Sequence, residues 1–202
     1  MKNAKDFILI ITWPYGLVNG ASSWYDFLLS DKGNYKFGHT ALILVNSKDG
    51  TNHYFDYGRF ENFTDLGRIR NSISDEKLEI KTRAVIINGD IINKDEIFQE
   101  INNNPSAKSL FLNSSNQKMY CSIINNINFK ESYQFAIGMM KNKYEYGPFI
   151  YNGLTCGRFV YRVVNKSNAS FLDKLKTILF DVLIRLKIFE KLATKIFFKN
   201  TY

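Results

Sequence analysis

The stretch YNGLTCGRFVY, residues 151–161, decides how this chain folds. Asn152-Gly153 is a turn signal, and apolar residues recur behind it with helical spacing, at positions 159, 160, 163 and 164. The pattern predicts a helix over about 154–165 with Cys156 in its first turn. Unpaired backbone N–H groups and the positive end of the helix dipole stabilise a thiolate there. A reactive thiol is therefore predicted, and a buried structural cysteine is the alternative.

A thiol nucleophile needs a base, and the chain contains two histidines. His39 begins the run HTALILV, which is typical of a buried strand. A histidine that opens a strand and a cysteine that opens a helix are the two parts of a thiol–imidazole site. We predict that His39 is the base for Cys156. A core histidine without a catalytic role is the alternative.

A predicted hairpin selects the partner of His39. The strand-like segments 39–46 and 52–57 flank an Asp-Gly turn signal. With the turn centred on residues 48–49, position 39 lies opposite position 58, and Asp56 lies one pair further along the same face. Asp56 would orient the imidazole and stabilise its charged form. His53 has the opposite parity and is the alternative, because a one-residue slip or a bulge would turn it toward His39.

Candidate substrate-binding residues follow the hairpin and precede it. Arg59 and Arg68 directly follow Gly58 and Gly67, Arg70 comes two positions later, and the three guanidiniums could clamp a carboxylate or phosphate. A solvated basic loop paired with acidic neighbours explains them equally well. Trp13 is a candidate wall of the cleft, with plain core packing as the alternative. The backbone N–H of Cys156 is one expected oxyanion donor, and the sequence identifies no second donor.

Composition indicates a folded globular protein of one domain plus an appendage. The chain has 202 residues, of which 45% are hydrophobic and 15% aromatic. Two cysteines 35 positions apart form neither a disulfide framework nor a zinc pattern, so we expect a reducing compartment, no metal and no cofactor. The apolar start ends in Trp-Pro and reads as a strand, with no signal peptide. A cytoplasmic or peripheral membrane protein is expected, and export by a dedicated secretion system is compatible with this.

Periodicity predicts an α+β fold in which the Cys156 helix packs on an antiparallel sheet. The predicted strands cover residues 6–13, 39–46, 52–57, 79–87, 108–113 and, more weakly, 118–124. The predicted helices cover residues 93–103, 129–143, 154–165 and 171–198, with a short one around 24–29. A polar stretch at 165–170 suggests a catalytic domain over 1–165 and a helical tail over 166–202.

The predicted tail is amphipathic and basic. Residues 171–202 carry seven basic and three acidic residues, a net charge of +4 out of +8 for the chain. Packing on the domain or on a second copy, as in a homodimer, is one expectation. Binding of the 171–199 helix to an anionic membrane is the other. Nucleic acid is not an expected partner, because the basic residues are scattered and no known binding motif is present.

The motifs resemble the circularly permuted branch of the papain-like NlpC superfamily, which includes the lecithin:retinol acyltransferase-like proteins. The similar stretches, in the family's order, are Phe37-Gly38-His39-Thr40, Tyr54-Phe55-Asp56-Tyr57-Gly58-Arg59-Phe60 and Asn152-Gly153-Leu154-Thr155-Cys156-Gly157-Arg158-Phe159-Val160. Thr155 stands where relatives usually carry Asn. The likeness covers about residues 6–165 and looks closer to an uncharacterised bacterial group of Bacteroidetes type, on Trp13-Pro14, Gly67-Arg68-Ile69-Arg70 and Tyr146-Gly147-Pro148-Phe149.

The resemblance implies a permuted papain-like fold and a cysteine-dependent hydrolase or acyltransferase. Its substrate would be an amide or ester, either a peptide or murein amide or a lipid acyl group. Cys156 would attack, His39 would act as base and then acid, and Asp56 would orient His39. Acyltransferase relatives carry a second histidine at the third position, so Asp56 fits the peptidase and amidase type at least as well. A non-catalytic module that docks on a membrane or an acidic partner is the alternative.

Overall fold

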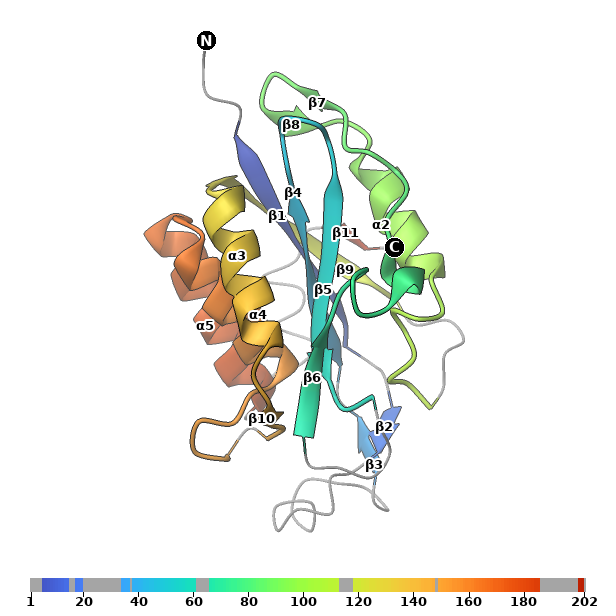
Figure 1. Cartoon of the computed structure of the whole chain (residues 1–202), viewed down its shortest axis with the longest axis vertical. Helices are drawn as coiled ribbons and strands as arrows, with labels where there is room; N and C mark the ends of the chain where they lie inside the picture. The colour runs from blue at the N-terminus through green and yellow to red at the C-terminus, as the bar shows by residue number, and fades with distance from the viewer. Residues whose placement is uncertain are drawn as a thin grey trace.

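An antiparallel sheet runs through the middle of the molecule, and helices cover both of its faces (Figure 1). The computed structural model describes residues 5–14, 17–19, 34–36, 38–60, 66–112, 118–147, 149–185 and 200–201. The sheet has the strand order β10-β6-β5-β4-β1-β9-β11. Its strands are β1 (Asp6–Trp13), β4 (His39–Val45), β5 (Asn52–Gly58), β6 (Leu66–Arg70), β9 (Tyr120–Ile127), β10 (Tyr144–Glu145) and β11 (Asn200–Thr201). The predicted α+β class with an antiparallel sheet is confirmed.

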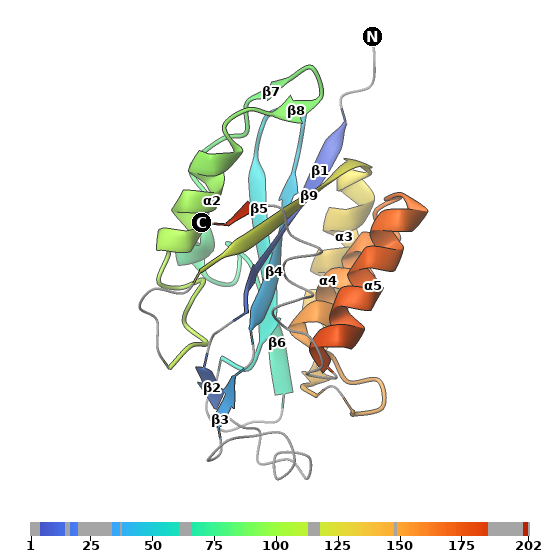
Figure 2. The same cartoon turned by 180° about the vertical axis from the view of Figure 1, so that it is seen from behind.

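Helices form a layer on each side of this sheet. The described helices are α2 (Lys94–Asn103), α3 (Phe129–Met140), α4 (Cys156–Lys166), α5 (Phe171–Arg185) and the short 3-10 helix η1 (Glu76–Leu78). Two further antiparallel strand pairs are formed by β2 (Leu17–Asn19) with β3 (Asn34–Lys36) and by β7 (Ile86–Ile87) with β8 (Asp90–Ile91). In both views α3, α4 and α5 lie together on one face and α2 lies on the other (Figures 1 and 2). The predicted helix around 24–29 and the part of the last helix beyond 185 fall outside the described residues.

Both faces of the central strands are buried, and for this reason their sequences are almost continuously apolar. In β1, Ile8 and Ile10 point toward α3–α5, and Leu9 and Ile11 point toward α2. The face toward α3–α5 is covered mainly by α4, through Phe159, Val160, Val163 and Val164. This is the helical spacing seen in the sequence, and it fixes which side of α4 meets the sheet.

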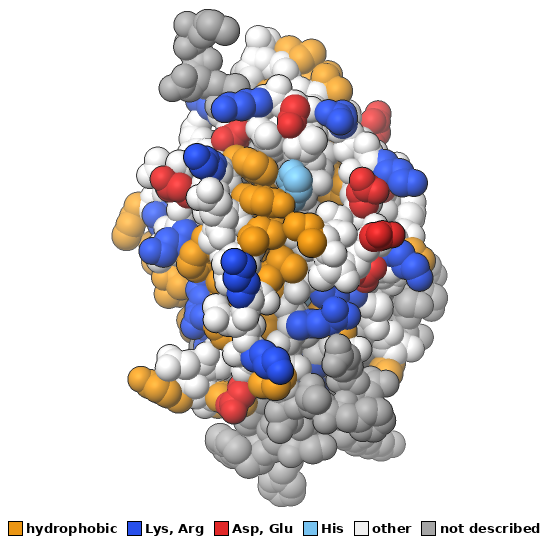
Figure 3. All heavy atoms as spheres, viewed as in Figure 1, with side chains coloured by type: hydrophobic (Ala, Val, Ile, Leu, Met, Phe, Trp, Pro, Cys, Tyr) orange, Lys and Arg blue, Asp and Glu red, His pale blue; other side chains and the backbone are white. Residues whose placement is uncertain are grey.

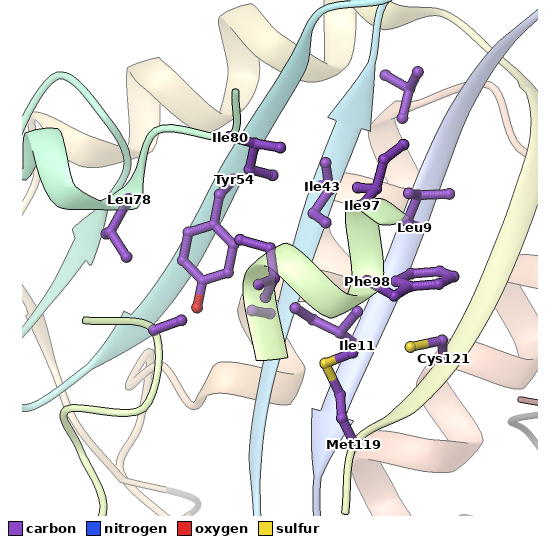
Figure 4. Close-up of a cluster of buried hydrophobic side chains, with 14 of the residues drawn as sticks. Leu9, Ile11, Ile43, Tyr54, Leu78, Ile80, Ile97, Phe98, Met119 and Cys121 are labelled. Carbon is purple, nitrogen blue, oxygen red and sulfur yellow. The ribbon is translucent and has the colours of Figure 1, made fainter. Parts of the chain in front are cut away.

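The opposite face is closed by α2 and by irregular segments (Figure 4). Ile97 and Phe98 of α2 pack over Leu9 and Ile11 of β1. Leu78, Ile80, Ala107 and Phe111 extend the same core along the sheet. Each of these side chains is at most 7% exposed, so this layer is as well packed as the one on the other face.

Two of the predicted strands are wrong. Residues 79–85 form no strand, and only Ile86–Ile87 pair, within a hairpin. Their backbone is satisfied by side chains and turns: the N–H groups of Lys81 and Thr82 donate to Glu100, and that of Ala84 donates to the Gly50 carbonyl. Residues 108–112 form turns after Pro105, and position 113 lies outside the described residues. Ile80, Ala84 and Phe111 are buried without belonging to a strand, whereas Val85, Ile87 and Leu112 are exposed.

Strand β6 was not predicted, because its sequence, LGRIR, looks like a basic loop. It pairs with β5, with Arg70 opposite Asp56 and Arg68 opposite Gly58. Gly67 is required by packing and not by a turn. A Cβ atom there would lie 2.3 Å from the ring of Tyr57, which crosses over the strand at this point.

Helix α5 packs against α4 and does not hang free. Phe180 is 4% exposed and belongs to the same core as Phe159, and Thr177 and Asp181 are also buried. The division into a domain over 1–165 and a tail over 166–202 stays a prediction. In the ranges that the structure describes, no helix combines the length and apolar character needed to cross a bilayer.

Candidate active site

Helix α4 begins at Cys156, as the sequence predicts. Thr155 is the N-cap, with extended backbone angles and a side-chain oxygen that accepts the N–H of Arg158 at 3.1 Å. Asn152 turns the chain into the helix with a φ of 57°, and the Arg158 side chain donates to the Gly153 carbonyl. Cys156 is half-buried, so its thiol lies at the first turn of a well-capped helix and within reach of the surface.

The imidazole of His39 is held between aromatic rings at the beginning of β4. His39 pairs across the sheet with Trp13, and the two rings stack with centroids 6.0 Å apart and planes 8° apart. Phe111 meets the imidazole edge-on at 6.2 Å. Trp13 is fully buried and its Nε1 donates to Asn102 Oδ1 at 3.1 Å. Trp13 is thus placed behind the imidazole, where it orients the ring.

Asp56 lies beside His39 in the register that the hairpin predicts. Ala41 pairs with Asp56, which puts Asp56 on the same face as His39 and one pair away. The His39 Nε2 to Asp56 Oδ2 distance is 3.1 Å. His53, the alternative partner, points to the opposite face and packs against Phe129 and Tyr133 at ring distances of 5.5 and 4.9 Å. The structure therefore brings Asp56, and not His53, to the imidazole.

Cys156 meets His39 at the end of the sheet, although α4 packs on the face opposite to His39. Both residues stand at the first position of their elements, so the helix start reaches the strand start. Because Nε2 faces Asp56, Nδ1 is the nitrogen left for the sulfur. Burial lowers the pKa of His39, but hydrogen bonds to Asp56 and Cys156 outweigh it and raise the pKa to about 9. The geometry thus favours an imidazolium beside the sulfur.

Arg70 is buried next to Asp56 and binds its carboxylate. Its Nη2 and Nε donate to the two carboxylate oxygens of Asp56 at 2.7 and 3.1 Å. Nη1 donates to Ser109 and Nη2 also to the Ser106 carbonyl, both at 3.0 Å. Burial raises the pKa of Asp56, but Arg70 and His39 together hold it below its usual value. The expectation that Arg70 clamps a substrate anion is contradicted by this arrangement, because the guanidinium is 3% exposed and occupied internally.

The other two arginines lie nearer the surface. Arg59 follows β5 and its guanidinium lies 5.4 Å from the ring centre of Tyr146. Arg68 is exposed on β6 with its guanidinium 5.8 Å from the ring of Phe60. Arg59 directly follows Gly58, and Arg68 pairs with Gly58 across the sheet. In the register of the hairpin, Gly58 lies across from His39. They remain candidate substrate ligands at this end of the sheet.

Four of the predicted site residues form a row across neighbouring strands. Trp13, His39, Asp56 and Arg70 come from β1, β4, β5 and β6 and share the face that α2 covers. Sequence reasoning missed the roles of Arg70 and Tyr54. The hydroxyl of Tyr54 donates to Asp56 Oδ2 at 2.9 Å, and its position two residues before Asp56 was the available signal. Among the described residues, no group of His, Cys, Asp or Glu is arranged to hold a metal ion.

The raised pKa of His39 predicts how stability depends on pH. Its value of about 9 lies above the unfolded value of 6.5, so its stabilising contribution is complete below pH 6.5 and is lost as pH rises through 9. This loss should amount to about 3 kcal/mol of unfolding free energy. Urea unfolding of wild type and His39→Gln between pH 6 and 10 measures it as the difference between the two curves. Parallel curves would contradict the prediction.

Comparison with known proteins identifies the family. The model of the family described as type VI secretion system effector TseH-like matches residues 8–171. The crystal structure of the type VI secretion system effector TseH is similar, with a TM-score of 0.50 and 19% identity over 81% of this chain and 77% of that chain. At this low sequence identity, the structural similarity shows a shared fold and nothing more. No protein with a curated description matches. Because the family model spans most of the sequence, the chain belongs to the type VI secretion system effector TseH-like family.

Proposed function

We propose that this protein is an exported effector that works as a cysteine-dependent hydrolase or acyltransferase on an amide or ester. The observation that carries the proposal is the placement of His39 between the Asp56 carboxylate, at 3.1 Å, and the thiol that begins α4. The family supports export, and its name refers to type VI secretion. We also propose that the fold is a permuted papain-like one, since histidine precedes cysteine in the chain.

In the proposed reaction His39 takes the proton of the Cys156 thiol, and the sulfur attacks the substrate carbonyl carbon. The negative charge that develops on the carbonyl oxygen meets the free N–H groups at the start of α4. Collapse of the tetrahedral intermediate breaks the bond to the leaving group, which takes a proton from His39. Water, or an acceptor amine, then gives a proton to His39 and attacks the thioester carbon; the carbon–sulfur bond breaks, which releases the acyl product and returns Cys156 as the thiolate. Asp56 holds the imidazole ring in place through both steps.

The substrate is proposed to be a peptide or murein amide or a lipid acyl group. Arg59 and Arg68 lie at the end of the sheet that carries His39, and guanidinium groups bind carboxylates and phosphates in a bidentate manner. An aspartate at the third position fits an amide substrate at least as well as an ester.

An activated acyl ester tests the chemistry directly. We expect wild type to gain one acyl group at Cys156 at neutral pH, seen as a mass shift of the intact protein and released by hydroxylamine, as thioesters are. Cys156→Ala should gain none, while Cys121→Ala should match wild type, because burial raises the pKa of the Cys121 thiol far above its usual value. Equal acylation of wild type and Cys156→Ala would contradict the proposal.

One observation favours a second function, docking on an anionic membrane. Phe171, Leu172, Leu175 and Leu179 form an exposed apolar stripe on α5, from 41 to 77% exposed, on a segment with an excess of basic residues. We expect wild type to float with anionic vesicles and Leu172→Asp/Leu175→Asp to stay in the soluble fraction. Ile73→Asp, also at an exposed apolar position, is the control. Equal flotation of all three proteins would exclude α5 as the contact.

A further inference from the structure

Helix α5 brings a buried carboxylate to the first turn of α4. Asp181 is 3% exposed, and the hydroxyl of Thr155 donates to its Oδ1 at 3.2 Å. The contact is so close that Gly157 cannot be replaced freely, because a Cβ atom there would lie 2.7 Å from the same oxygen. Thr155 and Gly157 are the two neighbours of Cys156. Asp181 therefore touches the chain on both sides of the nucleophile.

The hydroxyl of Thr155 takes part in two hydrogen bonds, and Asp181 determines in which of them it is the donor. It must accept the N–H of Arg158, at 3.1 Å, to cap α4. A hydroxyl has one proton to donate, and giving that proton to Asp181 directs a lone pair toward Arg158. The carboxylate thus sets the rotation of the cap hydroxyl. Without an acceptor on α5, the hydroxyl would lose its buried partner and the first turn of α4 would lose an anchor.

Packing in the core fixes the part of α5 that carries Asp181. Phe180 enters the core that also holds Phe159 and Val160 of α4, and Thr177 is buried one turn earlier. Asp181 is consequently presented from a packed helix and not from a mobile chain end. The family match ends at residue 171, so Asp181 belongs to the part of the chain that the family model does not reach.

We propose that Asp181 is a positioning residue of the thiol site, acting through Thr155 to fix the first turn of α4 and hence the sulfur of Cys156 against His39. The proposal rests on the proposed function. It makes α5 a working part of the site, whereas the sequence pattern suggested a separable tail. Small displacements of a reacting atom are costly, and a shift of about 1 Å can slow a reaction about 10²-fold.

Two measurements on four variants test this role. Asp181→Ala is expected to slow acylation of Cys156 about tenfold or more and to speed hydrogen exchange of the amides of residues 156–159. Asp181→Asn keeps an acceptor oxygen on a side chain of the same shape, so it should restore both the acylation rate and the amide protection. Thr155→Val should resemble Asp181→Ala, because it removes the bridging hydroxyl. Thr177→Val, a buried change on α5 whose hydroxyl donates to the Asp173 carbonyl and not to Thr155, is the control for general loosening of the helix.

The outcomes separate this inference from the proposed function. A folded Asp181→Ala protein with the acylation rate and amide protection of wild type would overturn the positioning role. Equal losses in Asp181→Ala and Asp181→Asn would also overturn it, because the acceptor would then not matter. If wild-type Cys156 is not acylated at all, the proposed function fails. Amide exchange in the first turn of α4 still decides whether Asp181 anchors the cap.

Discussion

Replacing His39 by alanine is expected to slow acylation of Cys156 by an activated acyl ester about 10²–10⁴-fold. The imidazole takes the thiol proton, because His39 is the base that is hydrogen-bonded to Cys156 in the described site. The Asp56 carboxylate is bound by His39, Arg70 and Tyr54 and stands behind the imidazole. Intact-protein mass spectrometry over time gives the rate for wild type and variant under the same conditions.

His53→Ala is the matched control, because it removes the second histidine of the chain from the opposite face of the sheet. It should acylate at the wild-type rate. Thermal unfolding of both variants shows whether a slow rate reflects a lost base or a lost fold. A His39→Ala protein that is folded and acylates like wild type would remove the chemical basis of the proposed function.

Replacing Arg70 by methionine is expected to lower the free energy of unfolding by about 3–5 kcal/mol, because it leaves the buried Asp56 carboxylate without its bidentate partner. For a chain of this length the melting temperature should fall by about 6–20 °C. Asp56 keeps only the bonds from His39 and Tyr54. Calorimetric or circular dichroism melting measures the change.

Arg68→Met is the control for this prediction, since Arg68 lies on the same strand but is exposed. It should change stability by no more than about 0.5 kcal/mol. The double variant Asp56→Asn/Arg70→Met should recover part of the loss, because it removes the unpaired charge along with the guanidinium. Equal destabilisation by Arg68→Met and Arg70→Met would show that the ion pair is not the cause.

Local signals in the sequence were enough to place three side chains in the candidate site. The Asp-Gly turn fixed the hairpin register, and with it the parity that separates Asp56 from His53. The turn at Asn152-Gly153 and the apolar spacing behind it predicted a helix over about 154–165 with Cys156 in its first turn, and α4 begins at Cys156. Each of these inferences depends on residues within about twenty positions of one another, where turn geometry and strand alternation leave little freedom.

Contacts between distant segments could not be inferred in this way. Gly67 and Arg68 look like loop residues because the sequence does not reveal that the ring of Tyr57 needs a glycine beneath it. Arg70 was consequently assigned to substrate binding, whereas strand pairing places it under Asp56. The apolar character of Ile80 and Phe111 suggested that they lie in strands. In the structure both side chains are buried, but they belong to irregular segments. The bond from Thr155 to Asp181 joins two helices and has no local signature.

The two halves of the site differ in the sequence separation of the residues that form them. His39 and Asp56 are joined by one hairpin, whereas the sulfur comes from a helix 117 positions after the imidazole. Hairpin pairing closes a short loop, and docking of α4 must await long-range contacts. A half-assembled chain therefore carries Cys156 as an ordinary thiol. Docking of α4 places it beside His39, so the part of its acylation that depends on His39 reports the molecules in which these long-range contacts have formed.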